Sequence, residues 1–200
     1  MTHEEMKTIM RDTLLSKGLS SALRAMTFAE TFHRGQRKDG SHEFSHQLEM
    51  AEMILRLPDI DDLDATLAVC FLHDVREDYS VADAVLRRLF GHKIAHAVDL
   101  LTKEFGGVRI EDRLAYSRIS SNPIAAIVKG VDRTHNLSTM EGAFSPLKQR
   151  EYLQETTAHI RPMILRARSQ HSSCREVLTH ILARLDRSTA LSLTPAQALT

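Results

Sequence analysis

The stretch ATLAVCFLHDVRED, residues 65–78, joins an apolar segment directly to a cluster of ionisable side chains. Its first eight residues are apolar on nearly every helical face, which predicts a helix buried in the middle of a helical bundle. Four ionisable residues follow: His73, Asp74, Glu77 and Asp78. Burying them unpaired would be costly, and positions i, i+1, i+4 and i+5 span about 140° of a helix. We therefore expect all four to face one cavity, where a cation would offset their repulsion.

The rest of the chain predicts an all-α helical bundle. Apolar residues recur at three- and four-residue spacing, and strict alternation is hard to find. Asn122 before Pro123 is typical of a helix start, whereas Gly91 and the pair Gly106-Gly107 are typical of helix ends. Helices are expected at 4–16, 20–34, 46–57, 63–77, 81–90, 92–104, 110–120, 123–140, 146–170 and 174–187.

Length and composition predict one soluble domain. A chain of 200 residues suits a single core, and no repeat, low-complexity block or linker divides it. We expect a single domain over 1–200, with its motifs within about 20–170 and a C-terminal helix and loose tail at about 172–200. The hydrophobic share of 42% and the charged share of 26% exclude disordered and membrane classes.

Net charge and targeting signals limit which partners and which location we expect for the protein. The 26 basic and 26 acidic residues cancel, which argues against non-specific binding to nucleic acid or to a membrane. No apolar run is long enough to span a bilayer, and the first residues lack a signal peptide core, so we expect a cytoplasmic protein. Cys70 and Cys174 are too far apart for a disulfide framework or a Cys-rich zinc site, but eleven histidines invite a search for metal ligands.

Two further segments carry chemistry. The segment 129–136, KGVDRTHN, places Asp132 after an apolar helical run, and Gly130 suggests a close approach to the helix that carries His73 and Asp74. The segment 33–46, HRGQRKDGSHEFSH, concentrates cations in a loop punctuated by glycine. Arginine and lysine in such a loop can bind phosphate oxygens.

Four blocks together resemble the hydrolase domain of the RelA/SpoT family. They read FAETFHRGQRKDGSHEFSHQ, FLHDVREDYS, LFGHKIAHAVDLLTKE and VKGVDRTHNLSTM, in the family's order and near its spacing. The resemblance implies an all-helical HD domain, and it is closest to the small single-domain alarmone hydrolases, including the metazoan SpoT homologue. The length leaves no room for the synthetase and regulatory domains of the long members.

The resemblance also implies a site. The family's single manganese ion would be held by four ligands: His46, His73, Asp74 and Asp132. The catalytic Glu-Asp pair of the family falls on Glu77 and Asp78, which would orient or deprotonate the attacking water. Nucleotide contacts carry over to Arg37, Lys38, Asn136 and Thr139. His33 is expected to support the site without binding the metal, and the other histidines, His135 among them, are expected at the surface or in packing.

The implied reaction is that of a metal-dependent phosphohydrolase, which removes the 3′-pyrophosphate of ppGpp or pppGpp to leave GDP or GTP. Two alternatives remain open: hydrolysis of NADPH or another nucleotide, and nucleotide binding without catalysis. Three positions depart from the family pattern. Gln47 replaces proline, Arg76 replaces valine and Tyr79 replaces threonine. We expect Arg76 to pair with Glu77 or Asp78 and to lower the basicity of that carboxylate. The oligomeric state is left open.

Overall fold

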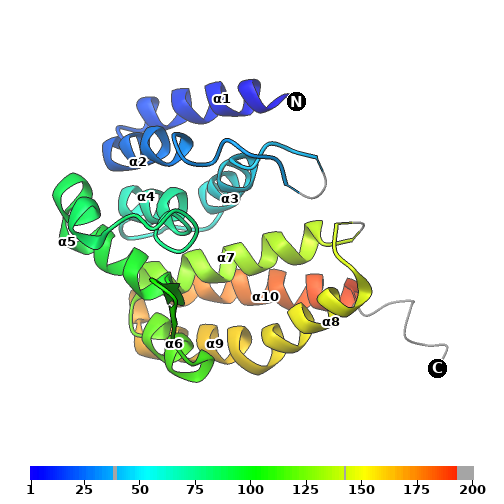
Figure 1. Ribbon diagram of the computed structural model, residues 1–200. Helices are drawn as coiled ribbons and strands as arrows, with labels where there is room; N and C mark the ends of the chain where they lie inside the picture. The colour runs from blue at the N-terminus through cyan, green and yellow to red at the C-terminus, as the bar shows by residue number, and fades with distance from the viewer. Residues whose placement is uncertain (38–39, 142, 193–200) are drawn as a thin grey trace.

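The fold is described from a computed structural model that covers residues 1–37, 40–141 and 143–192 (Figure 1). The predicted all-α architecture is confirmed. The α-helices are α1 His3–Ser16, α2 Ser20–Glu30, α3 Ser45–Leu55, α4 Leu63–Leu72, α5 Asp83–Leu101, α6 Asp112–Ser120, α7 Pro123–Thr139, α8 Pro146–Glu155, α9 Arg161–Gln170 and α10 Arg175–Ser192. Strands β1 Glu104–Phe105 and β2 Val108–Arg109 form a small antiparallel hairpin.

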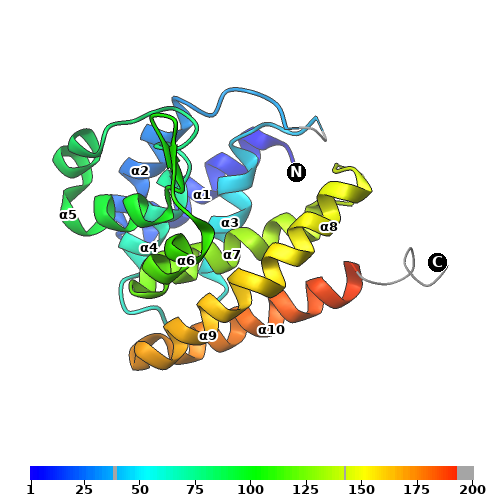
Figure 2. The same cartoon turned by 60° about the horizontal axis from the view of Figure 1, so that its bottom comes forward.

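The helices form two groups that meet at α4 and α7. Figure 1 shows α1 to α4 on one side of the molecule and α7 to α10 on the other. Helix α4 packs against α2, α3, α5 and α7, whereas α7 also packs against α6, α9 and α10. Figure 2 shows α9 and α10 running side by side beneath α7. The two central helices therefore bring sequence blocks about 60 residues apart into contact.

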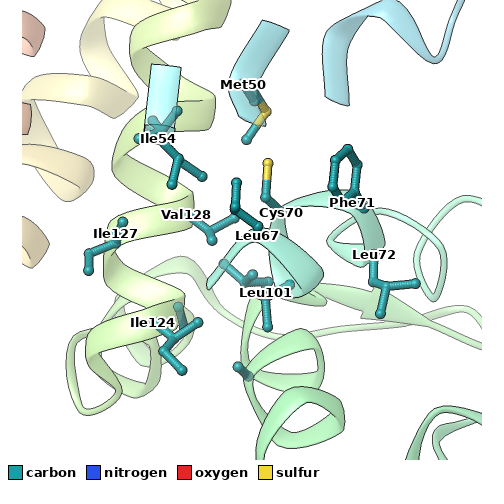
Figure 3. Close-up of a cluster of buried hydrophobic side chains, with 14 of the residues drawn as sticks. Met50, Ile54, Leu67, Cys70, Phe71, Leu72, Leu101, Ile124, Ile127 and Val128 are labelled. Carbon is teal, nitrogen blue, oxygen red and sulfur yellow. The ribbon is translucent and has the colours of Figure 1, made fainter. Parts of the chain in front are cut away.

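Helix α4 is buried as its sequence predicts. Every residue from Ala65 to Leu72 is at most 5% exposed. In Figure 3, Leu67 and Cys70 of α4 lie among side chains of α3 and α7, including Met50 and Val128. Burying one leucine side chain such as that of Leu67 stabilises the fold by about 1.5–3 kcal/mol. The end of this helix is thus held in place by its neighbours.

Local capping sets the start of both central helices. The Asn122 side chain accepts a hydrogen bond from the backbone N–H of Ala125 at 3.0 Å, and Pro123 takes the first helical position, as predicted. In α4, the Asp62 side chain accepts from the N–H of Ala65 at 3.0 Å. These caps satisfy backbone donors that the helices themselves leave unpaired.

Several predicted boundaries are wrong. Helix α4 ends at Leu72 and not at residue 77, so 73–79 continue as turns. The pair Gly106-Gly107 does not end a helix but forms the two-residue turn of the hairpin, with φ of 60° and 77°. The expected helix 146–170 is divided by a π-helix, Thr156–Ile160. The expected loose tail falls largely on residues 193–200, outside the described residues.

Gly130 has a different neighbour from the one expected. A Cβ added there would lie 2.6 Å from Cγ2 of Ile181 and 3.3 Å from Cδ1 of Ile164. The close approach is therefore to α9 and α10, not to the helix before His73. Both cysteines are free, as expected, and both are buried. In the part of the chain that the structure describes, no helix combines the length and apolar character that crossing a bilayer would require.

Candidate metal centre

His73 follows the last residue of α4 and is buried. Its Nδ1 lies 2.7 Å from the carbonyl oxygen of Cys70, so Nδ1 carries the hydrogen and donates it. Nε2 then points its lone pair towards Oδ2 of Asp74, 2.9 Å away, and has no well-aligned hydrogen-bond partner among the described residues. Two such electron-rich atoms repel each other unless a proton or a metal ion lies between them.

The pKa of His73 also shows that a positive charge is favoured between its ring and Asp74. Burial favours the neutral ring, but the charge of Asp74 outweighs burial and raises the pKa of His73 to about 9. In the metal-free protein, a proton on Nε2 of His73 supplies this positive charge. A divalent ion bound at this place would supply the positive charge instead and would displace that proton.

His46, the second residue of α3, reaches the same place from another helix. Its Nε2 lies 3.4 Å from Oδ1 of Asp132, and its Nδ1 lies 3.0 Å from Nδ1 of His135. Nε2 of His135 is 2.6 Å from the Glu49 carboxylate, which can only accept. A neutral His135 therefore accepts the hydrogen of His46 Nδ1, which leaves Nε2 of His46 free to bind a metal. His135 was expected at the surface or in packing, but it is buried and supports a candidate ligand.

Asp132 lies in the middle of α7, which brings it to the other three residues. Its Oδ2 accepts from Nζ of Lys129 at 2.8 Å, and its Oδ1 accepts from Nδ2 of Asn136 at 2.6 Å. Burial opposes ionisation of Asp132, but the charge of Lys129 holds its pKa well below the ordinary value. Asp132 is therefore a carboxylate with one oxygen turned towards His46.

Three of the four predicted ligands converge, and the fourth lies next to them. One ligand atom from each of His46, His73 and Asp74 lies within 4.8 Å of the others, which suits one ion bonded to all three at about 2.0–2.3 Å. Asp132 is outside that tight group but adjoins it through His46. Imidazole and carboxylate donors suit manganese, zinc or iron, and the site contains no thiolate that would favour structural zinc.

The predicted catalytic pair is separated. The backbone N–H of Asp78 donates to the carbonyl of Asp74 at 2.9 Å, one turn away, and Asp78 lines the cavity beside the ligands. Burial, then the charges of Asp74 and Glu77, raise the pKa of Asp78 to about 6. Both side chains are exposed, but Glu77 does not line this cavity, and its Oε2 accepts from the backbone N–H of Lys103 at 2.8 Å. Because α4 ends before these residues, the expected common helical face does not form.

Arg76 also departs from expectation. It does not pair with Glu77 or Asp78, because its guanidinium lies 3.4 Å from Oδ1 of Asp99 and 4.5 Å from the centre of the Phe105 ring. The side chain is buried against the hairpin. Arg76 therefore leaves the cavity carboxylates alone, and the pKa of Asp78 rises where a neighbouring arginine would have lowered it.

A cavity of about 330 Å³ opens over the ligands. Of the predicted nucleotide contacts, Arg37 and Asn136 line it, whereas the Thr139 hydroxyl donates to the His135 carbonyl at 3.1 Å. Lys38 lies outside the described residues. Five further residues line the cavity that no sequence motif assigned to the site: Glu43, Gln47, Lys129, Phe144 and Tyr152. Their only sequence signal is the closeness of Gln47 and Lys129 to predicted ligands.

Comparisons with known proteins show which families the chain resembles. Residues 25–104 match a family model described as HD domain. A Synechocystis protein named "Probable guanosine-3′,5′-bis(diphosphate) 3′-pyrophosphohydrolase" is 32% identical over 149 residues, which are 70% of this chain and 19% of the relative. The GTP pyrophosphokinase rsh of Brucella melitensis is 32% identical over 142 residues, 66% of this chain and 18% of the relative. The chain therefore spans about a fifth of the length of these relatives.

Among solved structures, a metazoan orthologue of SpoT that hydrolyses ppGpp has a similar fold. The TM-score is 0.67 at 16% sequence identity, and the match covers 86% of this chain and 94% of that chain. At this identity the likeness concerns the fold. It extends to helices beyond residue 104, where the family model ends.

Proposed function

We propose that this chain, an HD-domain protein related to the RelA/SpoT enzymes, is a metal-dependent phosphohydrolase that removes the 3′-pyrophosphate of ppGpp or pppGpp. The products would be pyrophosphate and GDP or GTP. The observation that carries the proposal is the convergence of His46, His73 and Asp74 beside a cavity that His46 and Asp74 line. Nε2 of His73 lacks a well-aligned partner among the described residues.

In this proposal His46, His73, Asp74 and Asp132 hold one manganese ion. When bound, a divalent ion supplies Lewis-acid activation of water and of a phosphoryl oxygen. Asp78 accepts the proton of the attacking water, because its carboxylate lines the cavity and a pKa of about 6 leaves it mostly ionised yet basic at neutral pH. Glu77 acts more remotely, through its hydrogen bond to the backbone of Lys103.

The nucleotide would lie in the cavity above this floor. Arg37 offers a guanidinium for phosphate oxygens, and Asn136 offers an amide that also holds Asp132. Contacts from Lys38 and Thr139 remain predictions. The single-domain interpretation over 1–200 is supported by α10, which packs along the same α7 that carries Asp132. A cytoplasmic location would give the site access to nucleotides.

The test is direct. Purified protein with manganese is incubated with ppGpp, and pyrophosphate and GDP are measured over time. Equal release of the two products supports the proposal, and Asp74→Ala should release neither. Absence of turnover with tight ppGpp binding would favour the non-catalytic alternative. Release of phosphate from NADPH in a parallel reaction, with no action on ppGpp, would favour the other hydrolase.

A further inference from the structure

Two of the positions that depart from the family pattern meet in space at His33. Tyr79 and Gln47 lie on opposite sides of this ring: the Tyr79 hydroxyl is 3.3 Å from Nδ1, and the Gln47 amide nitrogen is 3.4 Å from Nε2. His33 is 1% exposed, so both contacts replace water. The same Tyr79 hydroxyl also lies 2.7 Å from Oε1 of Glu43.

Only one assignment of donors and acceptors fits all of these hydrogen bonds. A carboxylate can only accept, so Tyr79 donates its hydrogen to Glu43 and its oxygen is free to accept from Nδ1–H of His33. Nε2 of His33 then accepts from the Gln47 amide. Burial lowers the pKa of His33, which agrees with a neutral ring that carries one hydrogen. The result is a chain of hydrogen bonds that begins beside the candidate ligand His46 and ends on Glu43.

Glu43 closes the neck of the basic loop, here defined as residues 35–37 and 41–43. Its Oε2 accepts from the backbone N–H of Gly35 at 3.0 Å, and its own N–H donates to the Gly35 carbonyl at 2.9 Å. The fit is tight, because a Cβ on Gly35 would lie 3.0 Å from that oxygen. A further backbone bond, from the N–H of Arg37 to the Ser41 carbonyl at 2.8 Å, continues the neck towards the cavity.

We infer that Tyr79 is a positioning residue that fixes the neck of the basic loop, and with it Arg37, over the cavity. Both Glu43 oxygens are occupied, one by the loop and one by Tyr79, so the tyrosine links the loop to the segment that follows Asp78. The role in substrate binding rests on the proposed function. Threonine, the residue common in the family at this position, is too short to span from this segment to both His33 and Glu43.

Tyr79→Phe tests the inference, with Tyr116→Phe as the matched control. The phenylalanine keeps the ring contacts to Phe32 and His33 and removes only the hydroxyl. Tyr116 also donates to a carboxylate, Glu155, at 2.6 Å, but in another part of the molecule. Hydrogen exchange of the Gly35 amide is measured in wild type and in both variants, together with KM, kcat and manganese affinity.

We expect Tyr79→Phe to speed exchange at Gly35 and to raise KM for ppGpp about tenfold, in line with loss of a charge-assisted hydrogen bond. The values of kcat and manganese affinity should stay within about twofold, and Tyr116→Phe should leave exchange at Gly35 unchanged. Unchanged exchange in Tyr79→Phe would overturn the inference, as would a loss of kcat or manganese binding with KM unchanged. If wild type fails to hydrolyse ppGpp, the proposed function fails, and the exchange measurement still decides whether Tyr79 fixes the loop.

Discussion

Two buried clusters of charge lie on α7, and they are balanced differently. Arg133 of α7 pairs with Glu155, which also accepts from Lys103 and from the Tyr116 hydroxyl. Lys103 pairs with Asp112 as well. Each acid of this cluster, which we call the Glu155 cluster, is therefore paired with two cations.

The metal centre on the adjacent residue of α7 is not balanced in this way. Lys129 pairs with Asp132, but Asp74 faces His73, which balances it by binding a proton where a metal ion could lie, and Asp78 adds a further carboxylate to the cavity. The pKa values record the difference, because that of Glu155 is held well below its ordinary value whereas that of Asp78 rises to about 6. A buried charged cluster thus indicates a ligand site only where the protein leaves the charge uncompensated.

The largest expected effect is loss of metal binding. It should follow a substitution in the candidate metal centre but not one in the Glu155 cluster. Asp74→Ala removes a ligand and the group that draws positive charge to His73, so we expect manganese binding to be lost and turnover to fall at least about 1,000-fold. Calorimetric titration and product release measure these. Glu155→Gln is the control and should bind manganese as wild type does. Retention of the metal by Asp74→Ala would show that the clusters do not differ as described.

The next largest effect is on turnover, and it distinguishes the roles of Asp78 and Glu77, which are adjacent in the sequence. Asp78→Asn removes a proton acceptor inside the cavity, and we expect kcat to fall about 100-fold with manganese still bound. Glu77→Gln replaces an exposed group that holds the Lys103 backbone, and we expect a loss of about threefold or less. Steady-state kinetics at saturating manganese compare them. A larger loss in Glu77→Gln would reverse the two assignments.

The Glu155 cluster should contribute to stability and not to metal binding. Glu155→Gln leaves Arg133 and Lys103 without their carboxylate, which we expect to cost about 2 kcal/mol, less than for a fully buried pair because Glu155 is one-quarter exposed. Urea unfolding at pH 7 measures the change. An unchanged free energy of unfolding would show that the cluster is no more than a set of surface pairs.

The same variant has a predictable pH dependence. Burial opposes ionisation of Glu155, but the charge of Arg133 and the hydrogen bonds from Tyr116 and Lys103 lower its pKa below the ordinary 4.5. Its contribution to stability is therefore complete above about pH 4.5 and is lost as the pH falls towards the folded pKa. The stability gap between wild type and Glu155→Gln should narrow from pH 7 to pH 3. A gap that widens on acidification would contradict the assigned direction.

The smallest expected effect concerns the packing beneath both clusters. Gly130→Ala places a methyl group 2.6 Å from Cγ2 of Ile181, so the neighbouring helices must shift. Strain of about 2 kcal/mol is partly offset by the better helix propensity of alanine, and we expect a net loss near 1 kcal/mol. Thermal unfolding measures it, and manganese affinity should not change. A gain in stability would mean that α9 and α10 yield easily.

The sequence predicts what is local or repeated. The apolar run before His73 predicts the buried helix, and the Asn122-Pro123 pair predicts the start of α7. The motif blocks predict four candidate ligands, of which the fold groups three closely and places Asp132 beside them. It does not predict where α4 ends, because the residues after His73 bind partners more than twenty positions away: Glu77 binds the Lys103 backbone, and Arg76 lies against Asp99. No local periodicity records such contacts.

The hairpin and the histidine contacts were missed for similar reasons. Strands of two exposed residues carry no alternating pattern, so Gly106-Gly107 gave the same signal as a helix end. The support that His135 gives to His46 joins residues 89 positions apart, and only the packing of α3 against α7 reveals it.

The central claim is that His46, His73, Asp74 and Asp132 bind one divalent ion together. Manganese titration of metal-free wild type and of Asp132→Ala, with bound ion counted per chain, tests it most directly, because Asp132 is the ligand contributed by the most distant segment. Wild type should bind one ion per chain, and the variant should bind it at least about tenfold more weakly. Equal affinity in the two proteins, or no bound ion in wild type, would contradict it.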